Sequence, residues 1–264
     1  MDDFSVATLA AAAGLGTAQV HVRRVGGGPA WASDDGRWIS PASLIKLPLA
    51  VAAAQAIVAR RLRWSTPVPV AAANLTANDA ASPLEPGYRS RVDELVSLML
   101  QRSDNVATNV LYDVLGRERA TAGVHALGFR RTFFRRKLSG AEPLIDDPQA
   151  TGRNSFPARE AVALLERLAR GRVPQASRLR AILATSYWDV KLSRGLATGD
   201  AFAHKTGDTD AVSHDAGILR LAGGGMWAIA VYTDLPSSDE LDRCFGAFMQ
   251  ALRPHLVAAA SSAR

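Results

Sequence analysis

Cysteine is almost absent from this sequence, because Cys244 is the single one among 264 residues. An internal disulfide is therefore impossible, which excludes the small proteins that depend on disulfides for stability. Cysteine and histidine also do not cluster at the spacing of a metal site, and we expect neither a metal nor another cofactor. Long apolar runs are lacking as well. No uncharged apolar stretch reaches the ~20 residues that cross a bilayer, so no membrane span is expected.

Lysine is scarce although the chain is basic. Of its 31 Lys and Arg residues only four are lysines, and with 25 Asp and Glu residues the formal net charge is +6. This balance is compatible with nucleic-acid binding and equally with small anionic substrates. Because a buried lysine can lose its proton and an arginine cannot, each lysine is a candidate for a special role. The four are Lys46, Lys137, Lys191 and Lys205.

Strand patterns lie near both ends of the chain, and helical patterns lie between them. Hydrophobic residues make up 48% of the sequence, enough for a substantial core. Alternating apolar and polar residues predict a strand over 18–23, and the turn at 26–29 predicts a return strand over 30–33. Three further segments look like strands, over 202–206, 216–221 and 226–232, with a glycine turn at 223–225 before the last. Apolar residues at helical spacing predict helices over 6–13, 43–61, 92–101, 105–115, 118–127, 157–170, 175–184 and 239–252.

This order of elements predicts the α/β (α+β) class. One sheet would combine strands from both ends of the chain, with an all-helical domain inserted between them. Residues 1–42 together with 186–264 would form the sheet domain, and residues 43–185 the helical domain. The run over 43–61 is apolar on nearly every face, which is typical of a buried helix, and Pro48 predicts an irregular start.

Ser43 and Lys46 form the first pattern that carries chemistry, in the run Ser43-Leu44-Ile45-Lys46. Residues three apart share one face of a helix, so the hydroxyl and the amine would be neighbours. A serine hydroxyl needs a base to become a good nucleophile. Burial lowers the pKa of a lysine because it penalises the charge, so Lys46 could be that base. A single S-x-x-K run is also expected by chance.

Two further patterns have both a functional and a structural interpretation. Ser103-Asp104-Asn105 lies between two predicted helices, where a hydroxyl could relay a proton and a carboxamide could bind a substrate amide. The same residue types are good helix caps. Lys205-Thr206-Gly207 ends a predicted strand, where its side chains could bind a carboxylate and its glycine would leave room for substrate. Alone, this run would be a strand that enters a turn.

The three patterns occur in the order S-x-x-K, S-D-N, K-T-G. This set resembles the motifs of class A β-lactamases and penicillin-binding proteins, and the chain looks most similar to class A. Residues 42–48 are similar to the nucleophile helix of the family, residues 154–157 to the end of its omega loop, and residues 214–217 to the strand after K-T-G. The resemblance implies a β-lactamase-like fold, with an antiparallel sheet flanked by helices and the active site between the sheet and the helical domain.

The resemblance also implies a role for each motif residue in acylation. Ser43 would be acylated by the lactam carbonyl, Lys46 would activate it, and Ser103 would pass a proton to the lactam nitrogen.

Substrate binding would involve the other motif residues. Asn105 would hold the acylamide side chain, and Lys205 with Thr206 would bind the substrate carboxylate. The backbone N–H groups of Ser43 and Asp208 would form the oxyanion hole, in which each fixed donor contributes about 3–4 kcal/mol.

Deacylation in class A needs a carboxylate in the omega loop, which falls in the aperiodic segment 138–155. The family pattern E-P-x-L-N resembles Glu142-Pro143-Leu144-Ile145-Asp146, so Glu142 is the first candidate. The final asparagine of the pattern is replaced by Asp146, and Asp146, Asp147 or no residue are the alternatives. A further departure is the lack of an arginine over 212–215, where we expect His214 to be a structural hydrogen-bonding residue.

These observations favour a hydrolase that opens the β-lactam ring through an acyl-serine intermediate. The alternatives are a D-alanyl-D-alanine carboxypeptidase or a serine esterase on the same fold, or a basic nucleic-acid-binding protein. The last is suggested by arginines interleaved with aromatics over 129–137, although packed phenylalanines with solvated or paired arginines fit that segment better.

We expect a monomer that acts on a small β-lactam or peptidoglycan-derived substrate and binds no nucleic acid. Proteins of this family are usually exported, whereas Met1–Phe4 is acidic and no signal peptide is expected here. The sequence therefore does not determine the cellular compartment.

Overall fold

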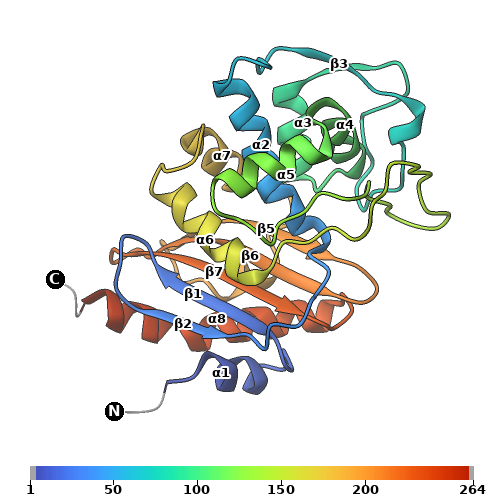
Figure 1. Ribbon diagram of the computed structural model, residues 1–264. Coiled ribbons are helices and arrows are strands. Elements are labelled where there is room, and N and C mark those ends of the chain that lie inside the picture. The colour runs from blue at the N-terminus through green and yellow to red at the C-terminus, as the bar shows by residue number, and fades with distance from the viewer. Residues whose placement is uncertain (1–3, 262–264) are drawn as a thin grey trace.

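An antiparallel sheet of five strands runs through the protein in the order β2-β1-β7-β6-β5 (Figure 1). Its strands are β1 (Gln19–Arg24), β2 (Ala30–Ser33), β5 (Ala201–Asp208), β6 (Ser213–Arg220) and β7 (Met226–Thr233). The computed structural model describes residues 4–261, so the acidic residues 1–3, on which the expectation about a signal peptide depends, lie outside it. Because β1 pairs with β7, the sheet joins both ends of the chain, as the strand patterns predicted. The K-T-G strand β5 lies at its edge.

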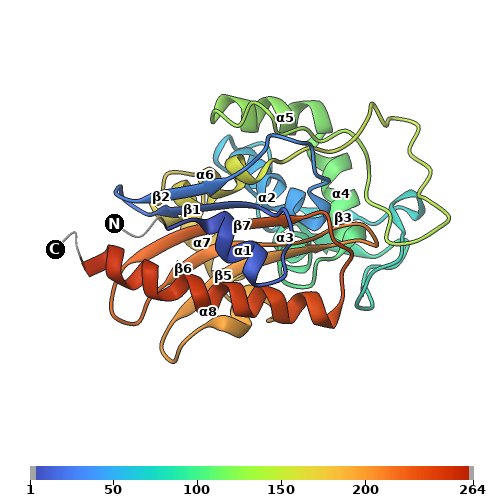
Figure 2. The ribbon, with the colours of Figure 1, turned by 90° about the horizontal axis from the view of Figure 1, so that it is seen from below.

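Helices cover both faces of this sheet (Figures 1 and 2). The helices α1 (Val6–Ala12) and α8 (Asp239–Ser261) pack on one face, against β7 residues such as Val231. On the other face α6 (Ala158–Ala169) packs against β7, whose Ala230 belongs to the core on that side. Successive residues of a strand point to opposite faces, so β7 is apolar throughout because neither face is open to water.

The second part of the molecule is built around one buried helix, α2 (Lys46–Val58). Its neighbours are the helices α3 (Val92–Gln101), α4 (Asn105–Leu115) and α5 (Arg117–Ala126), and α7 (Ala176–Leu183) packs against α3. Every residue of α2 from Lys46 to Ala54 is buried, which confirms the predicted buried helix. Its irregular start is confirmed too, because the 3-10 turn η1 (Ala42–Ile45) precedes it and Pro48 has no N–H to donate to residue 44.

The structure differs from the predicted elements in two places. A two-stranded sheet of β3 (Pro67–Pro69) and β4 (Arg89–Arg91) was missed, because three-residue strands with prolines leave almost no alternation to detect. The helix α8 continues beyond the predicted end at residue 252, although it contains Pro254. Buried residues such as Leu256 pack its last turns against the sheet, and this packing overrides the proline.

The division into a sheet domain (1–42 with 186–264) and a helical domain (43–185) stays a prediction. In the structure α6, which this division assigns to the helical part, contacts β1 and β7 of the sheet. Two short 3-10 turns complete the fold, η2 (Ala72–Asn74) and η3 (Lys191–Gly195). Within residues 4–261 no helix is both long and apolar enough to cross a membrane.

Candidate active site

Ser43 lies in the η1 turn, directly before α2 and beside the edge strand β5. The turn needs a left-handed residue at Ala42, where φ is +44°. The strand approaches so closely that a Cβ atom on Gly207 would lie 3.2 Å from the Ser43 nitrogen and 3.3 Å from the Leu44 nitrogen. Glycine at this position of K-T-G therefore permits β5 to lie against the backbone N–H groups of the nucleophile turn.

Lys46 is the centre of the site, because its side chain contacts Ser43 of the first motif and both Ser103 and Asn105 of the second. Its Nζ lies 2.8 Å from Ser43 Oγ, as expected from residues three apart on one face. The same Nζ lies 3.0 Å from Ser103 Oγ, 2.6 Å from the Ser103 carbonyl oxygen and 2.8 Å from Asn105 Oδ1. The S-x-x-K and S-D-N motifs, about sixty residues apart in the chain, thus meet at one nitrogen atom.

The Lys46 side chain is completely buried. Burial, with a smaller contribution from the charge of Lys205, holds the pKa of Lys46 well below the ordinary value of 10.5. The negative charges of Asp104 and Asp79 oppose this shift but do not cancel it. An amine with a lowered pKa next to a serine hydroxyl is the arrangement that activates a nucleophile.

The S-D-N segment between α3 and α4 caps a helix and also contacts Lys46. Asp104 caps α4, where its carboxylate accepts the Ala107 N–H at 2.8 Å. Ser103 adopts a left-handed backbone, with φ of +59°, and this turn directs both its hydroxyl and its carbonyl to Lys46. Asn105 is held from the other side, since its N–H donates to Asn78 Oδ1 at 2.5 Å.

The K-T-G segment supplies a second buried lysine at the end of β5. Lys205 is 1% exposed, and its Nζ donates to the Thr206 carbonyl oxygen at 2.8 Å. Burial lowers the pKa of Lys205 to about 8, against the opposing charge of Asp208. Thr206 and Asp208 line the same cleft as Ser43.

Lys191 is a functional candidate that the sequence analysis did not single out as a site residue. It lies in η3 with a left-handed backbone and is 1% exposed, and its Nζ forms an ion pair with the Asp208 carboxylate. That carboxylate also accepts from Ser213 Oγ at 2.8 Å. The scarcity of lysine in the sequence could have pointed to Lys191. All four lysines of the chain are buried in the structure, which fits a special role for each.

His214 has a structural role in this arrangement, as expected. Its Nδ1 accepts the Thr233 N–H at 3.2 Å, so its Nε2 carries the proton and donates to the Ser40 carbonyl oxygen at 2.7 Å. Burial lowers the pKa of His214 to about 4. The neutral ring thereby ties β6 to the segment that leads into the nucleophile turn.

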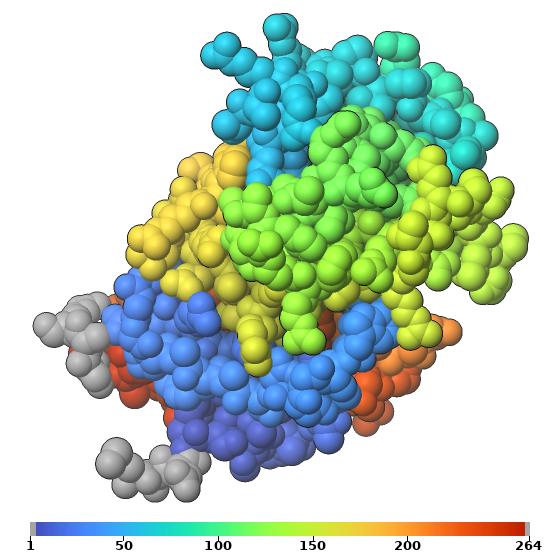
Figure 3. Space-filling view, viewed as in Figure 1, coloured from blue at the N-terminus to red at the C-terminus, as the bar shows by residue number. Residues whose placement is uncertain are grey.

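An open cleft of about 1010 Å³ contains the site. Its lining includes Ser43, Ser103, Asn105, Thr206 and Asp208. The yellow-green segment 138–155 lies at one edge of the molecule, next to the blue segment that leads into η1 (Figure 3). The cleft therefore lies between segments that are far apart in the sequence.

The omega-loop carboxylates differ in their surroundings. Glu142 lines the cleft, but it is exposed and its carboxylate accepts the Leu144 N–H at 3.1 Å. Asp147 forms an ion pair with Arg117 and is not free to act as a base. Asp146 is exposed. Asp79, which the sequence analysis did not single out, also lines the cleft, and its charge acts on both Lys46 and Lys205.

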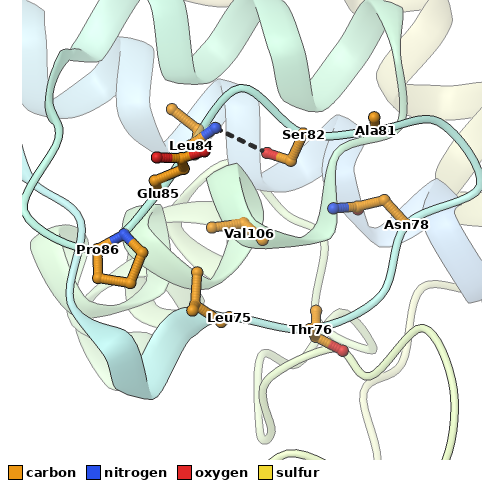
Figure 4. Close-up of a pocket in the computed structure, with 9 residues that line it drawn as sticks. All are labelled: Leu75, Thr76, Asn78, Ala81, Ser82, Leu84, Glu85, Pro86 and Val106. Atoms are coloured by element: carbon orange, nitrogen blue, oxygen red, sulfur yellow. Dashed lines mark hydrogen bonds between the residues drawn. The ribbon is translucent and has the colours of Figure 1, made fainter.

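A second, smaller pocket of about 460 Å³ lies beside the loop before α3 (Figure 4). Leu75, Leu84, Pro86 and Val106 give it an apolar lining. None of the residues predicted from the motifs lines it. Asn78 connects it to the site by accepting the Asn105 N–H, and Thr76 by accepting the N–H of Gly140, which lines the larger cleft. The chemistry is therefore placed in the larger cleft. Within the described part of the chain, no group of three His, Cys, Asp or Glu side chains could hold a metal ion.

A serine beside a buried lysine and a second serine, at the edge of an antiparallel sheet, defines the class of serine hydrolases with a lysine-activated nucleophile. The chain belongs to the beta-lactamase enzyme family, whose model matches residues 5–252. The predicted family, fold and hydrolase class are therefore confirmed.

Solved structures agree with this assignment. The beta-lactamase from Sphaerobacter thermophilus is 25% identical, with a TM-score of 0.81 over 94% of this chain and 96% of that one. PBP-A is 24% identical, with a TM-score of 0.78 over 94% and 96% of the two chains. A beta-lactamase from Xanthomonas campestris is 22% identical, with a TM-score of 0.80 over 96% and 99%. Among curated proteins there is no significant match.

Proposed function

We propose that this protein hydrolyses β-lactams through an acyl-enzyme on Ser43. The observation that carries the proposal is the contact of 2.8 Å between Ser43 Oγ and Lys46 Nζ, in a completely buried position that lowers the lysine pKa. The structural relatives support it. Two of those described above are β-lactamases, and the structure of a PBP-A variant, 24% identical to this chain, is an acyl-enzyme complex with penicillin G.

The contacts of Lys46 fit a neutral amine. A neutral amine has two N–H donors and one lone pair. Two of its contacts are to oxygens that only accept, the Ser103 carbonyl and Asn105 Oδ1. Because both N–H groups donate to these two oxygens, the lone pair of the nitrogen can accept a proton from a hydroxyl group. Ser43 Oγ at 2.8 Å is the nearer of the two hydroxyls.

Acylation would proceed in two proton transfers. Lys46 takes the Ser43 proton while Oγ forms a bond to the lactam carbonyl carbon, and the resulting oxyanion is bound by the N–H groups of Ser43 and Asp208. The ring C–N bond then breaks. Ser103 gives its proton to the leaving nitrogen and regains one from Lys46, which returns to its neutral form. Lys205 and Thr206 would bind the substrate carboxylate during both steps.

Deacylation needs a base that takes a proton from the attacking water. Glu142 is our first candidate, because it lines the cleft and lies in the segment that resembles the omega loop. Asp79 lines the same cleft and is the second. The water would add to the ester carbonyl, and the C–Oγ bond would then break so that Ser43 recovers its proton.

Two single variants separate these carboxylates. We expect Glu142→Gln to acylate at the rate of the parent and then to accumulate the adduct, with turnover reduced about 10²-fold or more. Asp79→Asn is the matched control and should turn over normally. Intact-mass measurements after rapid mixing would show the adduct. Unchanged turnover in Glu142→Gln removes this residue from the mechanism, and accumulation in Asp79→Asn would assign the base to Asp79.

The proposed function is tested by rapid mixing with a chromogenic cephalosporin, followed by mass spectrometry. Continuous turnover that disappears in Ser43→Ala supports the lactamase. A stable adduct on Ser43 without turnover would support a carboxypeptidase. Ester cleavage without any lactam adduct would support an esterase.

We also propose that the protein acts as a monomer without nucleic acid. The basic segment 129–137 supports the absence of nucleic acid, since Phe129 and Phe134 are buried and Arg135 stacks on Phe133 at 4.4 Å from its centroid. Lys137 is paired with Asp113 at 3.0 Å. Salt-dependent retention on an oligonucleotide column would contradict this part of the proposal, and light scattering would measure the oligomeric state.

A further inference from the structure

We propose that Trp38, Arg136 and Arg153 form a subsite that selects acyl side chains carrying both an aromatic ring and a negative charge. This inference rests on the proposed function, because it assigns the part of the substrate that lies beyond the scissile carbonyl. The three residues line the cleft that contains Ser43. Trp38 precedes the nucleophile turn, and the two arginines come from the chain on either side of the segment 138–152.

Trp38 is an exposed indole held in place by a cation. Its exposed fraction is 49%, which is large for a tryptophan in a protein that buries Trp227 completely. The Arg153 guanidinium carbon lies 5.0 Å from the Trp38 ring centroid. This contact occupies one face of the indole and orders the ring. The other face is available for stacking by a substrate ring.

The two arginines carry charges that the protein does not neutralise. Among the residues that the structure describes, neither Arg136 nor Arg153 forms a salt bridge, whereas Lys137 beside them is paired with Asp113. Arg153 is exposed and Arg136 half-buried. Glu142 lines the cleft in the segment between the two arginines, and its carboxylate accepts a backbone N–H rather than a guanidinium.

The rest of the cleft has a different charge. Around the end of β5 and the start of α8, four carboxylates outnumber two cations in the lining. The carboxylates are those of Asp208, Asp210, Asp239 and Asp242, and the cations are Arg194 and Lys191, of which Lys191 is paired with Asp208. A substrate with a second negative charge is therefore attracted to the arginines and repelled by the carboxylates. This difference would orient the acyl side chain toward Trp38.

A matched series of penicillins tests the proposal. Benzylpenicillin, carbenicillin and ampicillin share the ring and differ at the α-carbon, which carries hydrogen, a carboxylate or an ammonium group. For the protein we expect kcat/KM to fall in the order carboxylate, hydrogen, ammonium, with about tenfold between the extremes. The ratio should shrink at high salt because the arginines are not fully buried. If the acyl-enzyme is stable, the acylation rate constant replaces kcat/KM.

Variants assign the selectivity to the residues. Arg153→Gln and Arg136→Gln should each reduce the carboxylate-to-ammonium ratio about threefold, and together they should abolish it. Trp38→Leu should lower kcat/KM for all three ring-bearing penicillins through KM, by about fivefold, while a penicillin with a short alkyl side chain is unaffected. Arg119→Gln, an exposed arginine on α5, is the control for loss of one charge. It should leave the ratio unchanged.

The outcomes distinguish this inference from the proposed function. If no lactam acylates Ser43, the proposed function fails and the inference fails with it. If acylation occurs but the carboxylate-to-ammonium ratio is near one, or is unchanged in the double arginine variant, the subsite is wrong while the function stands. A ratio that falls equally in Arg119→Gln would also overturn it, because the selectivity would then come from net charge alone.

Discussion

Replacement of Lys46 by arginine tests the central step of the mechanism. Arginine supplies several N–H donors, but it carries a positive charge because it does not lose its proton in proteins. Lys46→Arg should therefore retain the contacts to the Ser103 carbonyl and Asn105 Oδ1 and lose the lone pair that accepts the Ser43 proton. Removal of a general base costs about 10²–10⁴-fold in rate, which is roughly 3–5 kcal/mol of barrier.

The stability of this variant must be measured separately, because Lys46 is completely buried. A larger side chain in a packed site costs about 1–3 kcal/mol. Lys46→Met, in contrast, leaves two carbonyl oxygens without donors, at about 1–3 kcal/mol each. Thermal unfolding of both variants shows whether enough folded protein is present. The control is Lys137→Arg, since Lys137 is also buried but contacts Asn74 and Asp113 rather than Ser43.

The assay is the burst of a chromogenic cephalosporin in stopped flow, with intact mass spectrometry of the adduct. We expect the burst rate of Lys46→Arg to fall by at least 10²-fold, and that of Lys137→Arg to stay near the parent's. A folded Lys46→Arg protein that acylates within about tenfold of the parent would refute the reasoning, because the base would then be another group.

Two pH-dependent predictions follow from the buried bases. The pKa of Lys205 is about 8, so its charge is lost above that pH, and KM for a carboxylate-bearing lactam should rise about tenfold between pH 7 and 9. The methyl ester of the same lactam should show no such rise, and identical profiles would contradict the binding role. The pKa of His214 is about 4 when folded and 6.5 when unfolded, so protons bind the unfolded chain preferentially as the pH falls through this window. The free energy of unfolding, measured with urea, should therefore decrease by about 2 kcal/mol between pH 7 and 5. The variant His214→Gln should not show this decrease. Equal decreases in both proteins would show that other groups cause it.

Much of the fold could be predicted because local patterns agreed with the tertiary structure. The alternation in β1, the apolar run of β7 and the uniformly apolar run of α2 reflect burial directly, since these elements face the core on one or more sides. The extension of α8 past Pro254 could not be predicted, because the packing of its last turns on the sheet decides it. The three-residue strands β3 and β4 were too short to leave a pattern.

The candidate site, like the fold, could be predicted from the sequence only in part. Ser43 and Lys46 are three residues apart, so helix geometry alone placed them together, and the order of the three motifs identified the family. The arrival of Ser103 and Asn105 at the same amine depends on a left-handed turn between α3 and α4. No periodicity encodes such a turn.

The sequence by itself determined the reactive groups and the type of fold, because motif spacing and hydrophobic periodicity are local properties of the chain. Only the tertiary structure decided the electrostatics of the site. Burial from all sides lowers the pKa of Lys46 and Lys205. The packing of distant segments pairs Lys191 with Asp208 and stacks the exposed Arg153 on Trp38. Desolvation and charge pairing depend on what surrounds a group in space, and those surroundings come from segments up to two hundred residues apart.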